Sequence, residues 1–254
     1  MSAPAAAAPP APTSSLTATL LMFLRLLAHD AGVMLLRSRS GIGAPTEYFL
    51  RRETLTAGFL PDVVLALLEE GGQVVVGPAT RVGEGDRAPR SLGTLFADLN
   101  FSPEITANGW TIPQASEIDV RGRLKAFTLA PSIVANSGWG LHVYWLLEEP
   151  LDLRREDRRA HAAALLRRLA ERLGGETRAL TIPHAGFQQV PPGGTPTFTI
   201  AACDPARMLR VPGSLNTNRG SVGRVVHVEQ LEVNHRYRLD MLDAALRRGP
   251  KEGA

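Results

Sequence analysis

The chain has 254 residues, 44% of them hydrophobic, which is enough for one large domain with a sizeable core or for two small domains. Its 28 basic and 25 acidic residues give a formal net charge of +3, well short of a histone-like polycation. The single cysteine, Cys203, excludes a disulfide framework and a cysteine-based zinc cluster. No run of about 20 uncharged apolar residues is present that could cross a membrane. We therefore expect a soluble protein of the cytoplasm.

Apolar spacing and turn residues predict the elements in chain order. Residues 1–15 are an Ala/Pro-rich tail expected to be disordered, residues 16–248 a single domain, and residues 249–254 a flexible C-terminus. Helices are predicted at residues 17–36, 61–70 and 152–173, and a short one just after Asp204. Strands are predicted at 73–76, 94–101, up to 135, up to 147, at 197–202 and at 225–228, with loops at 82–91 and 183–196. Residues 136–140 join two of these strands as a hairpin. The mixture of helices and strands, without strict βαβ alternation, favours the α+β class.

The strand predicted at 94–101 is largely apolar but contains Asp98 and Asn100. Side chains two apart in a strand share a face, so these two project together. A buried carboxylate is costly unless it is paired or binds a cation. Two interpretations remain: Asp98 lies at a strand end where it meets solvent or an arginine, or it helps to bind a cation.

Residues 137–145, SGWGLHVYW, place two glycines in the predicted hairpin turn. Glycine permits positive φ, and successive amides in such a turn can form an anion-binding nest. His142 follows on the next strand, and no second histidine lies at metal-ligand spacing, so a polyphosphate suits it better than a metal. The alternative is a half-buried hairpin histidine without a ligand.

Residues 203–220, CDPARMLRVPGSLNTNRG, gather polar and basic side chains around a Pro-Gly turn: Arg207, Arg210, Asn216, Asn218 and Arg219. Fixed donors on a tightly folded backbone are typical of a phosphate-binding loop. Asp204 is also a plausible helix N-cap, a role that requires no further function.

In this order, the segments ADLN, SGWGLHVYW and DPARMLRVPGSLN resemble the archaeo-eukaryotic primase superfamily, specifically the primase-polymerase domains of phages, plasmids and integrated elements. In that family an acidic-x-acidic strand precedes a Ser-Gly-x-Gly-x-His-x-Tyr-Trp hairpin and a segment close to Asp-Pro-Ala-Arg-x-Leu-Arg-x-Pro-Gly-Thr-x-Asn. The resemblance covers about residues 73–228. It implies an α+β fold whose mixed or antiparallel, RRM-like catalytic sheet is accompanied by an accessory α/β module and flanking helices.

Carried over residue by residue, the resemblance implies nucleotidyl transfer by a two-metal mechanism. Asp98 and Asp204 would hold Mg²⁺ or Mn²⁺, with Asn100 at the place of the second acid. The triphosphate of the incoming nucleotide would be held by Ser137, Gly138, Gly140, His142, Arg210 and Asn216. The implied activity is the synthesis or extension of primers on single-stranded DNA from nucleoside triphosphates.

Asn100 departs from the family pattern, because an amide coordinates through oxygen but carries no charge. A unit charge about 4 Å away is worth on the order of 4 kcal/mol at an effective dielectric constant of about 20. Glu104, Glu117 or Asp119 would compensate only if one of them approached. The alternative function is a catalytically weakened module of a replication-initiation complex that binds nucleotides or single-stranded DNA. An unrelated α+β protein whose motifs coincide by chance is the third hypothesis.

Two further features concern partners. The chain contains no GxxxxGK[ST] phosphate-binding sequence, so any helicase that unwinds the template would be a separate polypeptide or lie outside these residues. The arginine-rich helix predicted at 152–173 either contacts template phosphates or presents a solvated face.

Overall fold

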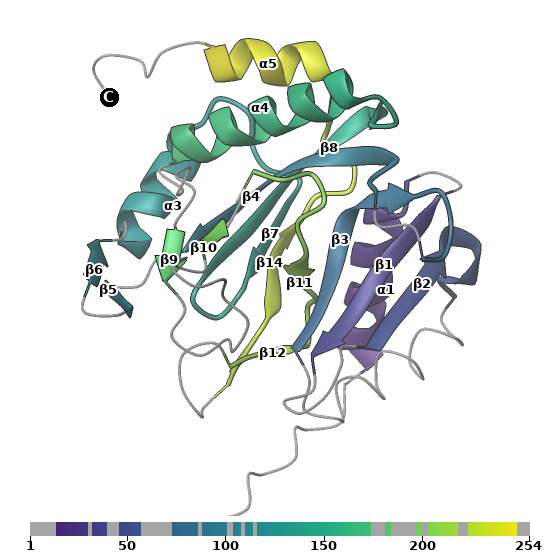
Figure 1. The fold of residues 1–254 in the computed structure, drawn as a ribbon, viewed down its shortest axis with the longest axis horizontal. Coiled ribbons are helices and arrows are strands. Elements are labelled where there is room, and N and C mark those ends of the chain that lie inside the picture. The colour runs from purple at the N-terminus through teal and green to yellow at the C-terminus, as the bar shows by residue number, and fades with distance from the viewer. Residues whose placement is uncertain are drawn as a thin grey trace, which may run out of the picture.

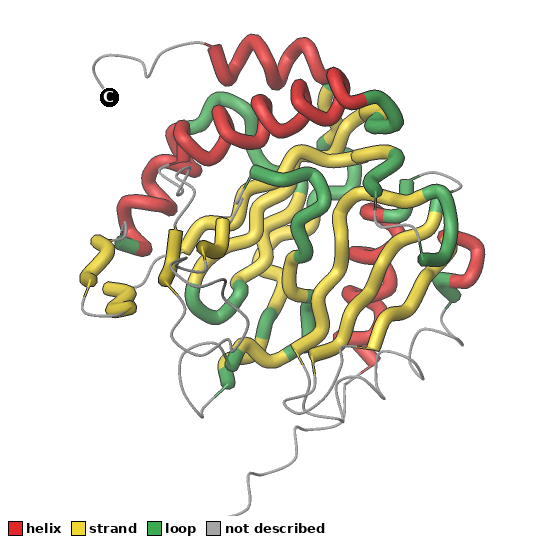
Figure 2. The backbone as a smooth tube through the Cα atoms, viewed as in Figure 1, coloured by secondary structure: helices red, strands yellow, loops and turns green. Residues whose placement is uncertain are grey.

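The computed structural model describes residues 14–29, 32–39, 46–56, 73–85, 88–100, 104–107, 110–113, 116–173, 181–183, 197–199, 203–217 and 223–247. These residues form an α+β structure around one large sheet, as the sequence predicts (Figure 1, and strands in yellow in Figure 2). The predicted helix at 61–70 and the core of the predicted loop at 183–196 lie outside the described residues, as do Asn218 and Arg219.

The large sheet has the strand order β14-β7-β8-β4-β3-β1-β2, with β11 added to β3 and β15 added to β8. All its pairs are antiparallel except that of β15 with β8. Its strands are β1 (Val33–Arg39), β2 (Thr46–Arg51), β3 (Gln73–Arg81), β4 (Ser91–Asn100), β7 (Ile133–Asn136), β8 (Gly140–Asp152), β11 (Leu209–Arg210), β14 (His227–Leu231) and β15 (Arg236–Tyr237).

Three small two-stranded sheets and several helices complete the described structure. The small sheets pair β5 (Glu104–Ala107) with β6 (Trp110–Pro113), β9 (Thr181–Pro183) with β10 (Thr197–Thr199), and β12 (Leu215–Asn216) with β13 (Arg224–Val225). The helices are α1 (Ser14–Leu27), the short 3₁₀ helix η1 (Arg52–Thr54), α3 (Glu117–Ala126), α4 (Glu156–Leu173) and α5 (Leu239–Arg247). No helix within the described ranges is long and apolar enough to cross a membrane.

The helices cover both faces of the sheet. Phe23 of α1 packs edge-to-face on Tyr144 of β8, at a centroid distance of 5.6 Å. Phe127, which follows α3, packs in the same way on Trp145 at 5.5 Å. Since neighbouring residues in a strand point to opposite faces, α1 and the end of α3 lie on opposite sides of the sheet. His142 shares the α1 side with Tyr144.

The centre of the sheet opens between β3 and β4. These strands pair only at Ala79–Leu92 and Thr80–Ser91. Further along, β3 pairs with β11 instead, through Leu209–Val76 and Arg210–Val75. The segment at 203–210 therefore enters beside β4 at the level where β4 no longer pairs with β3, as Figure 1 shows for β11.

The hairpin of β7 and β8 confirms the prediction for residues 136–140, but several boundaries differ. The helix predicted at 17–36 is wrong in its second half, because α1 ends at Leu27 and Val33 begins β1. A continuous apolar run fits a buried strand as well as a helical face. At its N-terminal end α1 starts at Ser14, inside the predicted tail.

The predicted short helix after Asp204 is a turn. The Asp204 carboxylate accepts the Ala206 N–H at 2.8 Å, and its carbonyl accepts the Arg207 N–H at 2.9 Å. Asp204 thus caps the turn as an N-cap residue would, but pairing of β11 with β3 extends the chain from Leu209 and stops a helix from forming. The helix predicted at 152–173 begins at Glu156, since β8 continues to Asp152.

Candidate functional site

Asp98 lies on β4 with its side chain only 9% exposed and ion-paired with Arg207. Arg207 Nε donates to Asp98 Oδ2 at 3.1 Å, and a second guanidinium nitrogen contacts the same oxygen. Burial raises the pKa of the Asp98 carboxyl, but the charges of Arg207, His142 and Arg210 and the Arg207 hydrogen bond outweigh burial and lower it below its ordinary value. Asp98 is therefore ionised at neutral pH. Of the two interpretations offered by the sequence, the structure shows the pairing with an arginine.

His142 lies directly opposite Asp98 in the β4–β8 register. Its Nε2 atom is 3.7 Å from Asp98 Oδ1, and the side chain is 1% exposed. Burial lowers the pKa of His142 to about 4, although Asp98 partly opposes the shift, so the ring is neutral at pH 7. Within the described part of the chain, Nδ1 is buried without a hydrogen-bond partner. A neutral ring with one unused nitrogen can hydrogen-bond a ligand but brings no charge.

The turn at residues 137–140 is held by its own hydrogen bonds. Gly138 has a φ of +88° and donates its N–H to Asn136 Oδ1 at 2.8 Å, while the Ser137 N–H donates to the Gly140 carbonyl at 2.8 Å. These two amides are therefore committed within the turn. They do not belong to the anion-binding nest that the sequence predicts. Their hydrogen bonds go to the Asn136 side chain and the Gly140 carbonyl, so neither amide is left to bind an anion.

Gly140 is required by strand packing. A Cβ atom at Gly140 would lie 2.2 Å from the Leu99 carbonyl oxygen and 2.9 Å from the Asn100 Cα atom. Gly140 pairs with Asn100 in the sheet, so the glycine lets the start of β8 approach the end of β4. This packing brings the turn to the end of the strand that carries Asp98.

The segment at 203–216 reaches both neighbouring motifs. Arg210 lies on β11, where its charge acts on Asp98 and His142 and its backbone hydrogen-bonds with His142. Asn216 on β12 is buried and donates its side-chain N–H to the Ser137 carbonyl at 2.6 Å. Together with the Arg207–Asp98 pair, these contacts join the three sequence motifs at the opening between β3 and β4.

The predicted metal ligands do not form a metal centre in this arrangement. Asn100 is exposed at the end of β4, and Asp204 is exposed with its carboxylate on the Ala206 N–H. Among the residues that the structure describes, no three His, Cys, Asp or Glu side chains are grouped so as to hold a metal ion. The buried carboxylate, Asp98, already has Arg207 as its counter-ion. These residues therefore do not fit a two-metal site as they are placed.

Two of the acids that could replace the missing charge at Asn100 pair with other residues. Glu117 bonds Arg121 within α3, and Asp119 bonds Ser116 at the start of the same helix. The structure does not describe the side chain of Glu104.

The fold of the chain is similar to that of a solved phage primase-polymerase domain. The primase-polymerase (AEP) domain of cyanophage S-2L is 16% identical, with a TM-score of 0.58, and the match covers 93% of this chain and all of that domain. The chain has the fold of this primase-polymerase domain. This likeness confirms the predicted α+β fold built on a large antiparallel sheet.

Two further matches have lower TM-scores. The catalytic domain of the primase RepB′ in complex with initiator DNA is 15% identical, with a TM-score of 0.49 and coverage of 90% of this chain and 92% of that one. The polymerase domain of Mycobacterium tuberculosis ligase D in complex with DNA is 19% identical, with a TM-score of 0.43 and coverage of 92% and 86%. No protein-family model and no curated protein matches the sequence.

Sequence reasoning missed two features of this primase-polymerase fold. Arg207 was recognisable as one of several basic residues, but nothing in the spacing assigns it to Asp98, which lies 109 positions earlier. Arg224, whose guanidinium lies over Trp139, carries no motif at all and reaches the turn only because β13 pairs with β12.

Proposed function

We propose that this chain binds a nucleoside triphosphate at the opening between β3 and β4 and transfers nucleotides from it to a primer on single-stranded DNA. The observation that carries the proposal is the meeting of three motifs at one place in a primase-polymerase fold. Arg207 contacts Asp98, Arg210 contacts His142, and Asn216 contacts Ser137.

The charge balance of the site favours a polyanion. Arg207 neutralises Asp98, and Arg210 adds a second guanidinium beside the neutral ring of His142. Guanidinium groups bind phosphate through paired hydrogen bonds, so Arg210 is the residue we assign to the triphosphate, with His142 Nδ1 as a further hydrogen-bonding atom. Ser137, Gly138, Gly140 and Asn216 would then shape the turn beside the phosphates.

Whether the reaction requires a divalent cation is considered separately. Asp98, Asn100 and Asp204 occupy the positions where the resemblance implies ligands for Mg²⁺ or Mn²⁺, and their arrangement does not fit that role. We therefore assign no step to a cation and make its requirement part of the assay.

The assay is incorporation of labelled ribo- and deoxynucleotides on a primed single-stranded template, with Mg²⁺, with Mn²⁺ and with chelator. We expect incorporation by the wild type and a loss of about tenfold or more in two variants. Asp98→Asn leaves Arg207 without its counter-ion, and Asp204→Ala removes the carboxylate that holds the turn carrying Arg207. Asp157→Asn is the matched control, because Asp157 is an exposed acid on α4 that is paired with Arg155 just before the helix. No incorporation by the wild type, or equal incorporation by Asp204→Ala, contradicts the proposal.

Asn100 and the Arg207–Asp98 pair favour a second candidate, a module that binds nucleotides or single-stranded DNA with little catalysis. Asn100→Asp separates the two candidates, because it restores one charge worth on the order of 4 kcal/mol at about 4 Å. We expect a gain in incorporation of up to about a thousandfold if transfer is the function.

Asn234→Asp is the control for Asn100→Asp, because it makes the same change in the exposed turn before β15. Unchanged incorporation by Asn100→Asp, with triphosphate binding retained, selects the binding module.

A further inference from the structure

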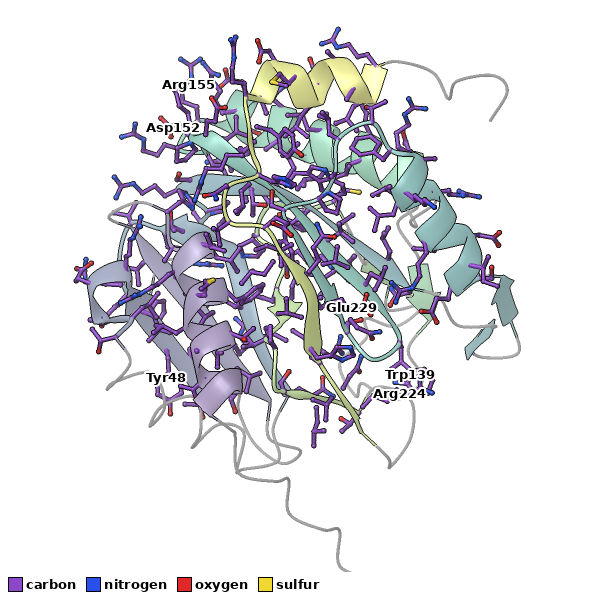
Figure 3. All side chains as sticks on the ribbon, turned by 180° about the vertical axis from the view of Figure 1, so that it is seen from behind. Tyr48, Trp139, Asp152, Arg155, Arg224 and Glu229 are labelled. Carbon is purple, nitrogen blue, oxygen red and sulfur yellow. The ribbon has the colours of Figure 1, made fainter. Side chains whose placement is uncertain are left out.

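Trp139 occupies the tip of the turn between β7 and β8, stacked on an arginine. The guanidinium carbon of Arg224 lies 3.7 Å from the centroid of the Trp139 ring. The same guanidinium donates to the Gly138 carbonyl at 3.0 Å, which fixes it under the turn. Figure 3 shows the two side chains together at the tip of the hairpin, far from the helical layer of α4 and α5.

This tryptophan is placed differently from a core tryptophan. Trp145 is fully buried and donates its indole N–H to the Leu129 carbonyl at 2.9 Å. Trp139 is half-buried, and its partner Arg224 is exposed, so part of the indole remains accessible at the surface. A cation against one aromatic face holds the ring in place.

The backbone of the turn lies very close to Arg224. A Cβ atom at Gly138 would lie 2.7 Å from the Arg224 Cβ atom, so the glycine is what allows β13 to reach the turn. Arg224 pairs with Asn216 between β13 and β12, and Asn216 donates to the Ser137 carbonyl. The Trp139–Arg224 stack is thus attached to the same residues that we assign to the triphosphate site.

We propose that Trp139 stacks against a nucleobase beside the triphosphate site, with Arg224 holding the indole in position. The proposal rests on the proposed function, since it concerns a ligand of that site. Aromatic side chains bind bases by stacking because every base presents a π face, and a nearby arginine adds attraction for the phosphate backbone. The base belongs either to the bound triphosphate or to an unpaired nucleotide of the DNA strand, and the chemistry of recognition is the same.

The test compares ligands with and without bases. Binding of dTTP and of oligo(dT) of about 15 nucleotides is measured by calorimetry, next to inorganic triphosphate and an abasic oligonucleotide of the same length. We expect Trp139→Ala to weaken binding of dTTP, oligo(dT) or both by about tenfold, and to leave the two baseless ligands unchanged. Trp139→Phe retains an aromatic face and should bind within about threefold of the wild type. Circular dichroism and urea unfolding of each variant check that the fold is retained.

Each outcome decides the proposal. Weaker binding of dTTP alone assigns the stack to the incoming nucleotide, and weaker binding of oligo(dT) alone assigns it to the strand. Equal binding of all ligands by Trp139→Ala and wild type overturns the stack, as does a loss that includes the baseless ligands, because the turn itself would then be disturbed. A wild type that incorporates no nucleotide but shows the base-dependent loss contradicts the proposed transfer and supports the stack.

Discussion

Asp98 and His142 are buried beside the partly buried Arg207, and the charge of each group depends on the others. Asp98 keeps its charge because Arg207 is in contact, and His142 loses its charge because burial outweighs the pull of Asp98. Truncating either member of a buried ion pair leaves an uncompensated charge and is strongly destabilising. We therefore expect this group to control both the stability of the site and its preference for anions.

His142 makes stability depend on pH in a defined window. Its pKa is about 4 in the folded chain, against about 6.5 when unfolded. Between these values the unfolded chain binds a proton that the folded chain does not, so stability falls as the pH is lowered through the window. From about pH 7.5 to about pH 4.5, the free energy of unfolding of wild type should fall by about 2.5 kcal/mol more than that of His142→Gln.

Urea unfolding at several pH values measures this difference. His235→Gln, which changes an exposed histidine, is the control. Parallel curves for wild type and His142→Gln would show that His142 does not titrate as described.

The residues of the site were predictable from the sequence to different degrees. Asp98, His142, Arg210 and Asn216 stand in motifs whose order is recognisable, and the structure brings them to one opening. Arg207 as the counter-ion of Asp98 was not predictable, because a long-range ion pair leaves no periodic signal. The roles of the grouped residues in catalysis and nucleotide binding remain predictions.

At the scale of elements, β4 and β8 position the site through their register. Asp98 faces His142 and Asn100 faces Gly140, so a slip by one residue would turn Asp98 to the opposite face of the sheet. The close approach at Gly140 makes this register specific, because any side chain there meets the Leu99 carbonyl.

Two glycine substitutions test this role of backbone packing. Gly140→Ala should lower the free energy of unfolding by about 3 kcal/mol, because its Cβ atom has no room against the backbone of β4. Gly122→Ala is the matched control, since nothing lies within 4 Å of a Cβ atom at this helical position, and it should raise stability by about 0.5–1 kcal/mol. Urea unfolding measures both changes, and equal effects would contradict the packing argument.

The sequence predicts elements whose apolar residues follow one clear period. It does not predict elements whose conformation depends on pairing with strands distant in sequence. The hairpin was readable from its two glycines and flanking apolar residues, and β4 from its apolar run. Val33 begins a strand because β1 pairs with β2 on one side and with β3 on the other. The apolar run alone does not reveal this pairing. The sequence predicts a helix after Asp204 for the same reason, since the pairing of Leu209 with Val76 makes this segment a turn followed by a strand.

At the scale of the whole molecule, the candidate site joins segments that are distant in sequence. β4, the β7–β8 turn and the segment at 203–216 contribute side chains from positions 98 to 216. A ligand that contacts all three therefore stabilises the folded state as a unit, because the unfolded chain cannot bring them together.

Thermal unfolding with and without dTTP tests this coupling. At a dTTP concentration of about 100 times its Kd, stability should rise by about 2.7 kcal/mol, which corresponds to an increase in Tm of roughly 5–10 °C for a chain of this size. Arg210→Gln should reduce the increase at the same concentration, and Arg238→Gln, at an exposed arginine before α5, should not. No increase for wild type, or the same increase for Arg210→Gln, contradicts the assigned site.

The short ladder between β3 and β4 has a consequence for how such a site changes during evolution. The width of the opening is determined by which main chains are hydrogen-bonded, and only two residue pairs close it at one end. Replacing an exposed side chain at the end of β4, as at Asn100, alters the chemistry that the site offers while the strand framework stays intact. Such a scaffold permits an acid to be exchanged for an amide, or regained, in a single mutational step.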